Sequence, residues 1–482
     1  MKARILVLAC IALIAVPRGA IATQSTETAI VISAQNAGPS PFIKKLTLTV
    51  SDITVLKRVR FAVTPKPGSV TRPISATYSK RYLGSRGYLD STNSRIVVPV
   101  FGLYAGYNNT VELTYLFNDG SSRTTRTIVG TQTFDDPCHY STPAVRQPRS
   151  TTKALSYDYM LVATNCGTTT PAVIDTDGAV RWVGTTGVGS HTTAFYNNGI
   201  YLSDEGLLRI ELDGVVTRVA DLQSLGIVGL HHSIDRGKYG LILDANTVKW
   251  VTSVNIEIDG RGKVLNKWFL GDIVRRAMIA GGDDPSGFVR ESTGQYQYST
   301  PSDWFHNNSV AYRKSDDSLI ISSRENFVIC LDYETKAIKW ILGDKTKEWY
   351  QYPSLRKYAL ELTPGSHAPL GQHSVSITKD DHLLLFDNGQ RSAQHHPLGY
   401  NRSYSAPRKY ELDLAARTAR EVWNFPNNQS IRSPFRSSVY EDAPDNYLVH
   451  YSNAPEFPRI LGVTAAGEKV FDYSYSAKAF RS

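Results

Sequence analysis

The stretch Asp303-Trp304-Phe305-His306-Asn307-Asn308-Ser309-Val310, with the later run Leu319-Ile320-Ile321-Ser322-Ser323-Arg324, decides the fold of this chain of 482 residues. The pattern predicts two neighbouring β-strands joined by a short polar turn. His306 stands just before the first strand and Arg324 just after the second. In an antiparallel pair these two positions lie at the same edge of the sheet, so we expect the two side chains to meet there.

The same unit recurs twice along the chain. His232-Ser233-Ile234 precedes a strand at 241–244, and His373-Ser374-Val375 precedes a strand at 383–387. Two more strands, 327–331 and 337–342, complete the central unit. Roughly 40 to 45 residues with four strands is the period of a β-propeller blade, so the three histidines should converge on one face of a central channel. A polar residue follows the second strand of each unit at the matching place: Asn246, Arg324 and Asn388.

Six modules can be traced from Tyr157 onward, and the first lacks one inner strand, which we expect the chain at 141–150 to supply. The sequence therefore predicts an all-β fold, with an N-terminal β-sandwich followed by a six-bladed β-propeller. The modules cover 157–184, 191–222, 231–274, 304–344, 371–427 and 433–475. The expected domains are a signal peptide at 1–22, a β-sandwich domain at 23–135, a linker at 136–155 and a propeller catalytic domain at 156–482.

The first 22 residues are typical of a secretory signal peptide. Lys2 and Arg4 precede an apolar run at 5–16, and Ala20 and Ala22 have the spacing of a cleavage site. Lipoprotein cleavage before Cys10 is the weaker alternative. No later run approaches the roughly 20 apolar residues of a spanning helix, so we expect an exported protein without membrane insertion.

Charge and cysteine content narrow the partners. Removal of the signal peptide lowers the formal net charge from +9 to +6, which suits an anionic small substrate but is equally typical of an ordinary basic exported protein. No basic run interleaved with aromatic residues points to nucleic acid. Export favours a disulfide, and we predict Cys138 with Cys166, because both flank the start of the propeller region. Cys330 lies in mid-strand and is predicted to be a buried thiol.

Three long segments, 272–303, 345–370 and 390–405, should lie over the histidine face, and the first should contain a helix at 272–280. Two interpretations of their aromatic residues stay open: they form walls for a planar aromatic ligand, with Tyr404 a substrate contact, or they pack the loops against the sheets. These residues are Tyr296, Tyr298, Trp349, Tyr350, Tyr352, Tyr358, Tyr400 and Tyr404.

The convergent imidazoles suggest acid–base or nucleophilic chemistry near neutral pH. A guanidinium beside them favours a sulfate-like or phosphate-like oxyanion. Arg324 should repel a cation, and no Asp or Glu stands at the equivalent strand-starting corners, so we predict neither a metal nor a cofactor. The sequence has no Gly-rich phosphate loop and no GxSxG motif, which disfavours nucleotide donors and serine hydrolase chemistry.

Several motifs resemble the bacterial arylsulfate sulfotransferase family, which does not use the usual nucleotide sulfate donor. They are Asp-Trp-x-His-x-Asn-Ser at 303–309, Ser-Ser-Arg at 322–324, His231-His232, and Gly371-Gln372-His373. The resemblance spans most of the chain. It implies ping-pong transfer of a sulfuryl group from a phenolic sulfate to a phenol in the periplasm, with these small molecules as partners; a homodimer stays open.

The resemblance also implies roles for individual residues. His373 would be the nucleophile, and His306 and Arg324, with Asn308 close by, would bind the sulfuryl oxygens. His232 would be the general acid and base, with His231 as its rival for that place. Two alternatives remain: a noncatalytic ligand-binding propeller, and a metal-assisted ester or sulfate hydrolase.

Overall fold

The computed structural model describes residues 28–164, 166–167, 169–188, 190, 192–204, 206–292, 300–476 and 480–481. The expected signal peptide, Tyr296 and Tyr298 lie outside these residues. The described part contains three short α-helices, α1 (Lys80–Ser85), α2 (Leu270–Ala280) and α3 (Pro353–Arg356), and three 3₁₀ turns, η1 (Gln223–Leu225), η2 (Glu348–Gln351) and η3 (Asn427–Gln429). No helix in these ranges has both the length and the apolar character needed to cross a membrane.

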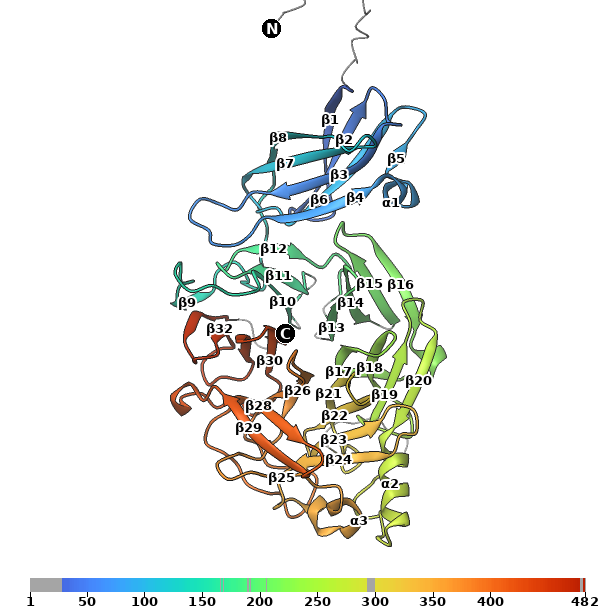
Figure 1. Cartoon of the computed structure of the whole chain (residues 1–482), viewed down its shortest axis with the longest axis vertical. Coiled ribbons are helices and arrows are strands. Elements are labelled where there is room, and N and C mark those ends of the chain that lie inside the picture. The colour runs from blue at the N-terminus through green and yellow to red at the C-terminus, as the bar shows by residue number, and fades with distance from the viewer. Residues whose placement is uncertain are drawn as a thin grey trace, which may run out of the picture.

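The N-terminal part consists of two four-stranded antiparallel sheets over one hydrophobic core, as the predicted sandwich requires (Figure 1). In β7 every second side chain from Asn109 to Tyr115 is buried, so the alternating pattern directs one face to the core. In sheet order the strands are β1 (Ile30–Ala37), β2 (Ile43–Val50), β6 (Arg95–Phe101) and β5 (Leu89–Asp90), then β4 (Ile74–Ser79), β3 (Leu56–Val63), β7 (Asn108–Phe117) and β8 (Ser122–Gly130).

The described residues from 144 onward form six small sheets. In sequence order along each sheet, the strands of the first three are β10 (Tyr159–Thr164), β11 (Ala172–Asp175), β12 (Val180–Val183) and β34 (Phe480–Arg481); β13 (Thr193–Tyr196), β14 (Gly199–Asp204), β15 (Gly206–Glu211) and β16 (Val216–Asp221); and β17 (Gly229–Arg236), β18 (Leu241–Asn246), β19 (Val254–Ile258) and β20 (Val264–Phe269).

The other three sheets carry the longest insertions. Their strands are β21 (Asn307–Arg313), β22 (Ser318–Ser323), β23 (Phe327–Asp332) and β24 (Ile338–Gly343); β25 (Glu361–Leu362), β26 (His373–Ile377), β27 (Leu383–Asp387), β28 (Ala406–Asp413) and β29 (Thr418–Asn424); and β30 (Ser438–Ala443), β31 (Asn446–Tyr451), β32 (Arg459–Thr464), β33 (Lys469–Ser474) and β9 (Ala144–Gln147). The six sheets correspond to the six predicted modules, apart from the added strands β9, β25 and β34 and the first two residues of β17.

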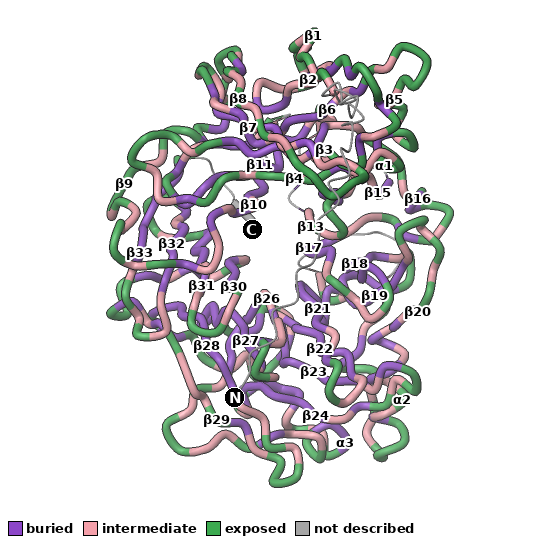
Figure 2. The backbone as a smooth tube through the Cα atoms, turned by 45° about the horizontal axis from the view of Figure 1, so that its top comes forward, coloured by how far each residue is buried: buried purple, intermediate pink, exposed green. Residues whose placement is uncertain are grey.

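The sheets follow one another around a common middle. Figure 2 shows β10, β13, β17, β21, β26 and β30 nearest that middle. The strands β22 and β23 are buried along almost their whole length, because the core clusters join this sheet to β17–β20 on one side and to β26–β29 on the other. This packing explains the unbroken apolar run at Leu319-Ile320-Ile321.

The prediction for the missing strand of the first sheet was wrong. The segment β9 pairs with β33 as the fifth strand of the last sheet. The C-terminal β34 instead pairs with β10 and completes the first sheet. The strands β10 and β34 lie far apart in the sequence, and no local sequence pattern indicates that they pair.

Two features hold the start of this region. Cys138 and Cys166 form a disulfide with 5.7 Å between their Cα atoms, and Cys330 is a buried free thiol in β23. The fully buried Arg181 pairs with Asp175 at 3.1 Å and donates to the carbonyl oxygen of Gly102 in the N-terminal part at 2.7 Å. The buried guanidinium thus joins the first of the six sheets to the N-terminal sandwich.

Candidate functional site

The predicted meeting of His306 and Arg324 is present at one edge of the β21–β22 pair. Asn307 lies opposite Ser323, and the backbone N–H of Arg324 donates to the carbonyl oxygen of His306 at 3.0 Å. His306 has a φ of 52°, a left-handed conformation that costs energy for a residue with a side chain. The strand pairing therefore fixes both residues at one corner.

The corners of four sheets open into one cavity of about 410 Å³. A second cavity of about 410 Å³ shares His232 and His373 with the first, so these two imidazoles separate the two spaces. The first cavity brings together five of the predicted site residues and three further ones: it is lined by His231, His232, His306, Arg324, His373, Phe435, Arg436 and Asn453.

The His373 ring is held by uncharged acceptors. Its Nδ1 lies 2.8 Å from Oδ1 of Asn388 and 3.0 Å from the carbonyl oxygen of Gly371. The Asn388 amide nitrogen donates to the carbonyl oxygens of Ser433 and Arg436 at 2.7 and 2.8 Å, which turns Oδ1 toward the ring. Because both neighbours of Nδ1 accept hydrogen bonds, Nδ1 carries a proton, and in the neutral ring the lone pair is then on Nε2.

The His306 ring is held by a carboxylate. Its Nδ1 lies 2.7 Å from Oδ2 of Asp303, and both side chains are buried. The Thr252 hydroxyl donates to the other Asp303 oxygen. The buried carboxylate fixes the orientation of the ring and keeps Nδ1 as its donor nitrogen.

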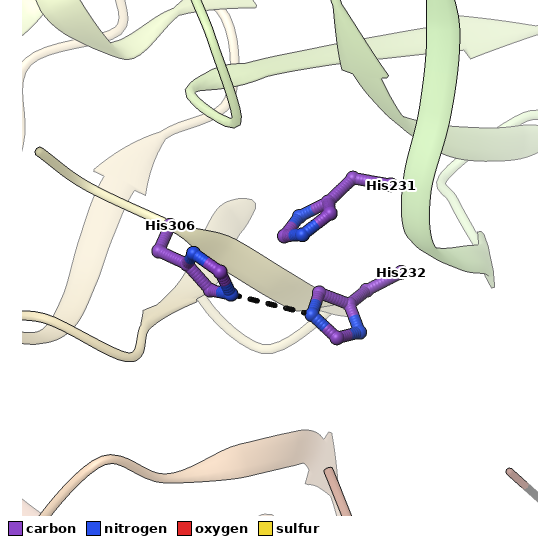
Figure 3. Close-up of side chains that lie close together, drawn as sticks. All are labelled: His231, His232 and His306. Carbon is purple, nitrogen blue, oxygen red and sulfur yellow. Dashed lines mark hydrogen bonds between the residues drawn. The ribbon is translucent and has the colours of Figure 1, made fainter. Parts of the chain in front are cut away.

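His231 and His232 complete the imidazole cluster, which is drawn in Figure 3. Nε2 of His232 lies 3.4 Å from Nε2 of His306, and the His232 ring centre is 5.4 Å from that of His373. His231 is turned differently, because its Nδ1 lies 2.9 Å from the carbonyl oxygen of Asn307. His232 lies between His306 and His373 and lines both cavities, whereas His231 lines only one of them.

Arg324 is paired with its neighbour Glu325, which is almost fully buried. The other Glu325 oxygen accepts hydrogen bonds from the Ser392 hydroxyl and the backbone N–H groups of Ala393 and Gln394 at 2.6 to 3.0 Å. Burial alone raises the pKa of this carboxyl, but Arg324, His306 and the Ser392 hydrogen bond outweigh it and lower the pKa to about 2. Glu325 thus couples the guanidinium to the loop at 390–405.

Two acidic residues from outside the strand-starting corners reach the histidines. Asp303 reaches His306 from three residues earlier in the chain. Asp244 lies 3.7 Å from Nδ1 of His231 and accepts the backbone N–H of His232. The signal in the sequence was the spacing Asp303-x-x-His306, whereas Asp244 comes from a paired strand and has no local signal.

Two predicted substrate contacts do not line this cavity. The Asn308 amide nitrogen donates to the carbonyl oxygen of Gln372 at 2.8 Å, so this residue holds the backbone just before His373. The Tyr404 hydroxyl lies 3.4 Å from a guanidinium nitrogen of Arg408, away from the histidine corners.

The aromatic residues of the second insertion pack into the protein. Trp349 is fully buried, and Tyr350, Tyr352 and Tyr358 lie against the same core. Of the two interpretations left open by the sequence, loop packing is therefore the one that applies to these residues. The aromatic side chain at the cavity is Phe435, which is 44% exposed and which the sequence analysis missed.

Comparison with known proteins adds independent information. Residues 145–478 match the family described as Arylsulfotransferase (ASST), and residues 46–133 match the Arylsulfotransferase Ig-like domain. The arylsulfate sulfotransferase AssT of Escherichia coli O6:H1 is 25% identical over 237 residues, which are 41% of this chain and 39% of that protein. AssT of Lelliottia amnigena is 24% identical over 289 residues, 52% of this chain and 47% of that protein.

The match therefore spans less than half the length of each of these relatives. Among solved structures, a protein of unknown function from Bacteroides thetaiotaomicron aligns over 94% of this chain and 99% of its own, with 10% identity and a TM-score of 0.30.

Proposed function

Because the chain belongs to the arylsulfotransferase family, we propose that it is an enzyme that moves a sulfuryl group from a phenolic sulfate ester to a phenol. The reaction is ping-pong, with a sulfohistidine intermediate and no nucleotide sulfate donor. The protein acts in the periplasm after loss of residues 1–22. The six sheets form a six-bladed β-propeller whose ring is closed by the pairing of β34 with β10.

The observation that carries this proposal is the setting of His373. Two acceptor oxygens at Nδ1 leave the lone pair on Nε2, in a ring that shares its cavity with Arg324 and His306. A neutral imidazole with this tautomer is a nucleophile, and the Arg324 guanidinium and the His306 ring beside it suit the oxygens of a sulfuryl group. A ligand-binding site would need neither arrangement.

The proposed reaction has two half-reactions. Nε2 of His373 attacks the sulfur atom of the donor, the bond between sulfur and the phenolic oxygen breaks, and His232 gives its proton to the departing phenolate. The acceptor phenol next gives its proton to His232, and its oxygen attacks the sulfur while the N–S bond breaks. His306 and Arg324 bind the sulfuryl oxygens as negative charge develops on them.

The cavity supports an aromatic donor. Its volume of about 410 Å³ lies within the usual range for small-molecule sites. Phe435 is partly exposed on its wall, with its ring centre 5.9 Å from the Arg324 guanidinium. An aryl ring can stack there while its sulfate group faces the arginine.

Mass spectrometry tests the proposal. The protein is mixed with phenyl sulfate and no acceptor, and its mass is measured before and after phenol is added. We expect a gain of one sulfuryl group on His373, which phenol then removes. The adduct should be absent in His373→Asn. His367→Asn is the matched control for that variant, because this imidazole pairs with Glu421 outside both cavities. Phenol release without an adduct indicates hydrolysis or direct transfer, and no reaction at all indicates a ligand-binding propeller.

A further inference from the structure

The imidazole cluster has a property that sulfuryl transfer does not require. Within the described residues, His231, His232 and His306 form a group whose potential metal-ligating atoms all lie within 4.8 Å of one another, and all three side chains are buried. Their ring centres are 3.9 Å apart for His231 and His232, and 4.5 Å for His231 and His306. Figure 3 shows the three rings gathered around one small space.

The distance between two imidazole nitrogens of this cluster fits a tetrahedrally coordinated metal ion. Nε2 of His232 and Nε2 of His306 are 3.4 Å apart. A zinc ion with Zn–N bonds of about 2.0–2.1 Å separates any two of its tetrahedral ligands by about 3.3–3.4 Å. These two imidazoles thus already have the spacing of two ligands, and His231 is the third.

Groups behind the rings direct their lone pairs inward. Asp303 accepts a hydrogen bond from Nδ1 of His306 at 2.7 Å, and the carbonyl oxygen of Asn307 lies 2.9 Å from Nδ1 of His231. Oxygen acceptors on the far nitrogen are the usual outer partners of zinc-ligating histidines, since they fix the tautomer and the ring orientation. In both rings this leaves Nε2 as the ligand atom.

The local charge permits a cation despite the nearby guanidinium. Arg324 is paired with the buried carboxylate of Glu325. Asp303 and Asp244 add two fully buried carboxylates beside the imidazoles. The repulsion expected from the sequence is therefore offset by three acidic groups.

We propose that His231, His232 and His306 bind one zinc-class transition-metal ion, and that the bound ion reversibly blocks the site. Imidazole ligands suit Zn²⁺ and its neighbours Cu²⁺ and Ni²⁺ rather than Mg²⁺ or Ca²⁺. The inhibitory part rests on the proposed function, because the ion occupies the Nε2 atoms of the acid–base residue His232 and of His306. Binding of the ion itself does not depend on that function.

Calorimetric titration tests the binding. Tag-free protein is stripped with a chelator and titrated with ZnCl₂, and Co²⁺ is used as a second probe, because its visible absorption reports four-coordination. We expect one site per chain, which is lost in His231→Ala and in His306→Gln. Asp303→Asn should weaken binding by about 10–100-fold, as removal of an outer partner does.

Two variants serve as controls for the zinc titration. His367→Ala removes an imidazole beside a carboxylate outside the cluster and should bind zinc like the parent protein. His373→Asn should keep full zinc binding while it loses the sulfuryl adduct, which separates a failure of this inference from a failure of the proposed function. Absence of binding, or a site that survives His231→Ala and His306→Gln in folded protein, overturns the metal site. Turnover that persists at saturating zinc overturns the blocking role.

Discussion

The corner at His306 and the corner at His373 occupy equivalent places in neighbouring sheets, but their imidazoles face different partners. Nδ1 of His306 lies 2.7 Å from a buried carboxylate oxygen of Asp303. Nδ1 of His373 lies 2.8 Å from an amide oxygen of Asn388 and 3.0 Å from a backbone carbonyl oxygen. The repeat supplies the same side chain twice, and the acceptor behind it differs.

This difference separates two chemical roles. A carboxylate stabilises the imidazolium, whereas amide and carbonyl oxygens orient the ring without adding a negative charge. An imidazole that is oriented by uncharged acceptors is available as a nucleophile in its neutral form. In the proposed reaction, His306 therefore binds the sulfuryl oxygens and His373 is the nucleophile.

Removal of each imidazole in turn should give the largest effects. His373→Asn should reduce phenol release to the uncatalysed rate and abolish the adduct, because no nucleophile remains. His306→Asn should still form the adduct but more slowly, by about 10²–10³-fold, as expected when one group that stabilises the developing charge is lost. Rapid-mixing mass spectrometry distinguishes the two.

The outcome that contradicts this assignment is an adduct in His373→Asn, or none in His306→Asn after prolonged reaction. Both variants need a check of folding by circular dichroism. Both side chains are buried, and an altered partner could disturb the strand ends.

Exchange of the acceptor is the second test. Asn388→Asp puts a carboxylate behind His373, which raises the pKa of that imidazole, typically by about one to three units. The nucleophile is then protonated at neutral pH, so turnover at pH 7 should fall by about tenfold or more and recover at higher pH. The measurement is the pH dependence of kcat/KM, whose acid limb should move upward.

Asn246→Asp is the matched control. Asn246 is the last residue of β18, near the place where Asn388 follows β27, but its Oδ1 accepts the backbone N–H of Thr252 instead of facing an imidazole. This variant also buries a carboxylate, so it reproduces any general loss of stability. An equal shift of the acid limb in both variants would mean that the acceptor behind His373 is not the cause.

The reverse exchange should have a smaller effect. Asp303→Asn keeps an acceptor near Nδ1 of His306 but removes the negative charge, so the hydrogen bond that orients this imidazole is weaker. We expect kcat/KM to fall by about tenfold. The exposed Asp284→Asn is the control. An unchanged kcat/KM would contradict a role of Asp303 in positioning His306.

The repeating unit made much of the architecture predictable. Alternating and apolar runs predicted the sheets, and the placement of His306 and Arg324 at adjoining strand ends followed from antiparallel pairing alone. The helix predicted at 272–280 is α2, two residues longer at its start and followed by Gly281 as expected. Local periodicity and turn residues suffice for such features.

What could not be predicted depends on distant contacts. Glu325 follows Arg324 directly, but its role depends on backbone N–H groups some 68 residues later, at Ala393. Phe435 reaches the cavity from the last sheet. Asn308 looked like a substrate ligand because it lies in the motif, yet its amide faces the backbone of Gln372. Side-chain direction at a strand end depends on the neighbouring sheet, which no local pattern encodes.

The smallest effect is expected at Glu325, which pairs with Arg324 near His306 and takes no part in bond making. Its carboxyl pKa falls from 4.5 to about 2 in the folded protein, despite burial, through Arg324, His306 and the Ser392 hydrogen bond. A lowered pKa stabilises the fold above the unfolded pKa, and this stability is lost as the pH falls from about 4.5 through about 2. The contribution is about 3 kcal/mol at neutral pH.

Glu325→Gln should therefore lower the urea midpoint at pH 7 and flatten its dependence on pH between 5 and about 2. Glu456→Gln is the control, because that carboxylate pairs with Arg146 at the surface, is 72% exposed and should change the midpoint little. Glu325→Gln also leaves Arg324 without its carboxylate partner, so turnover should fall modestly while the adduct still forms on His373. The contrary outcome is a midpoint of Glu325→Gln that keeps the full pH dependence of the parent protein. In that case the contact of Glu325 with Arg324 and the 390–405 loop does not stabilise the fold. The difference between the His306 and His373 corners then lies only in the two imidazoles.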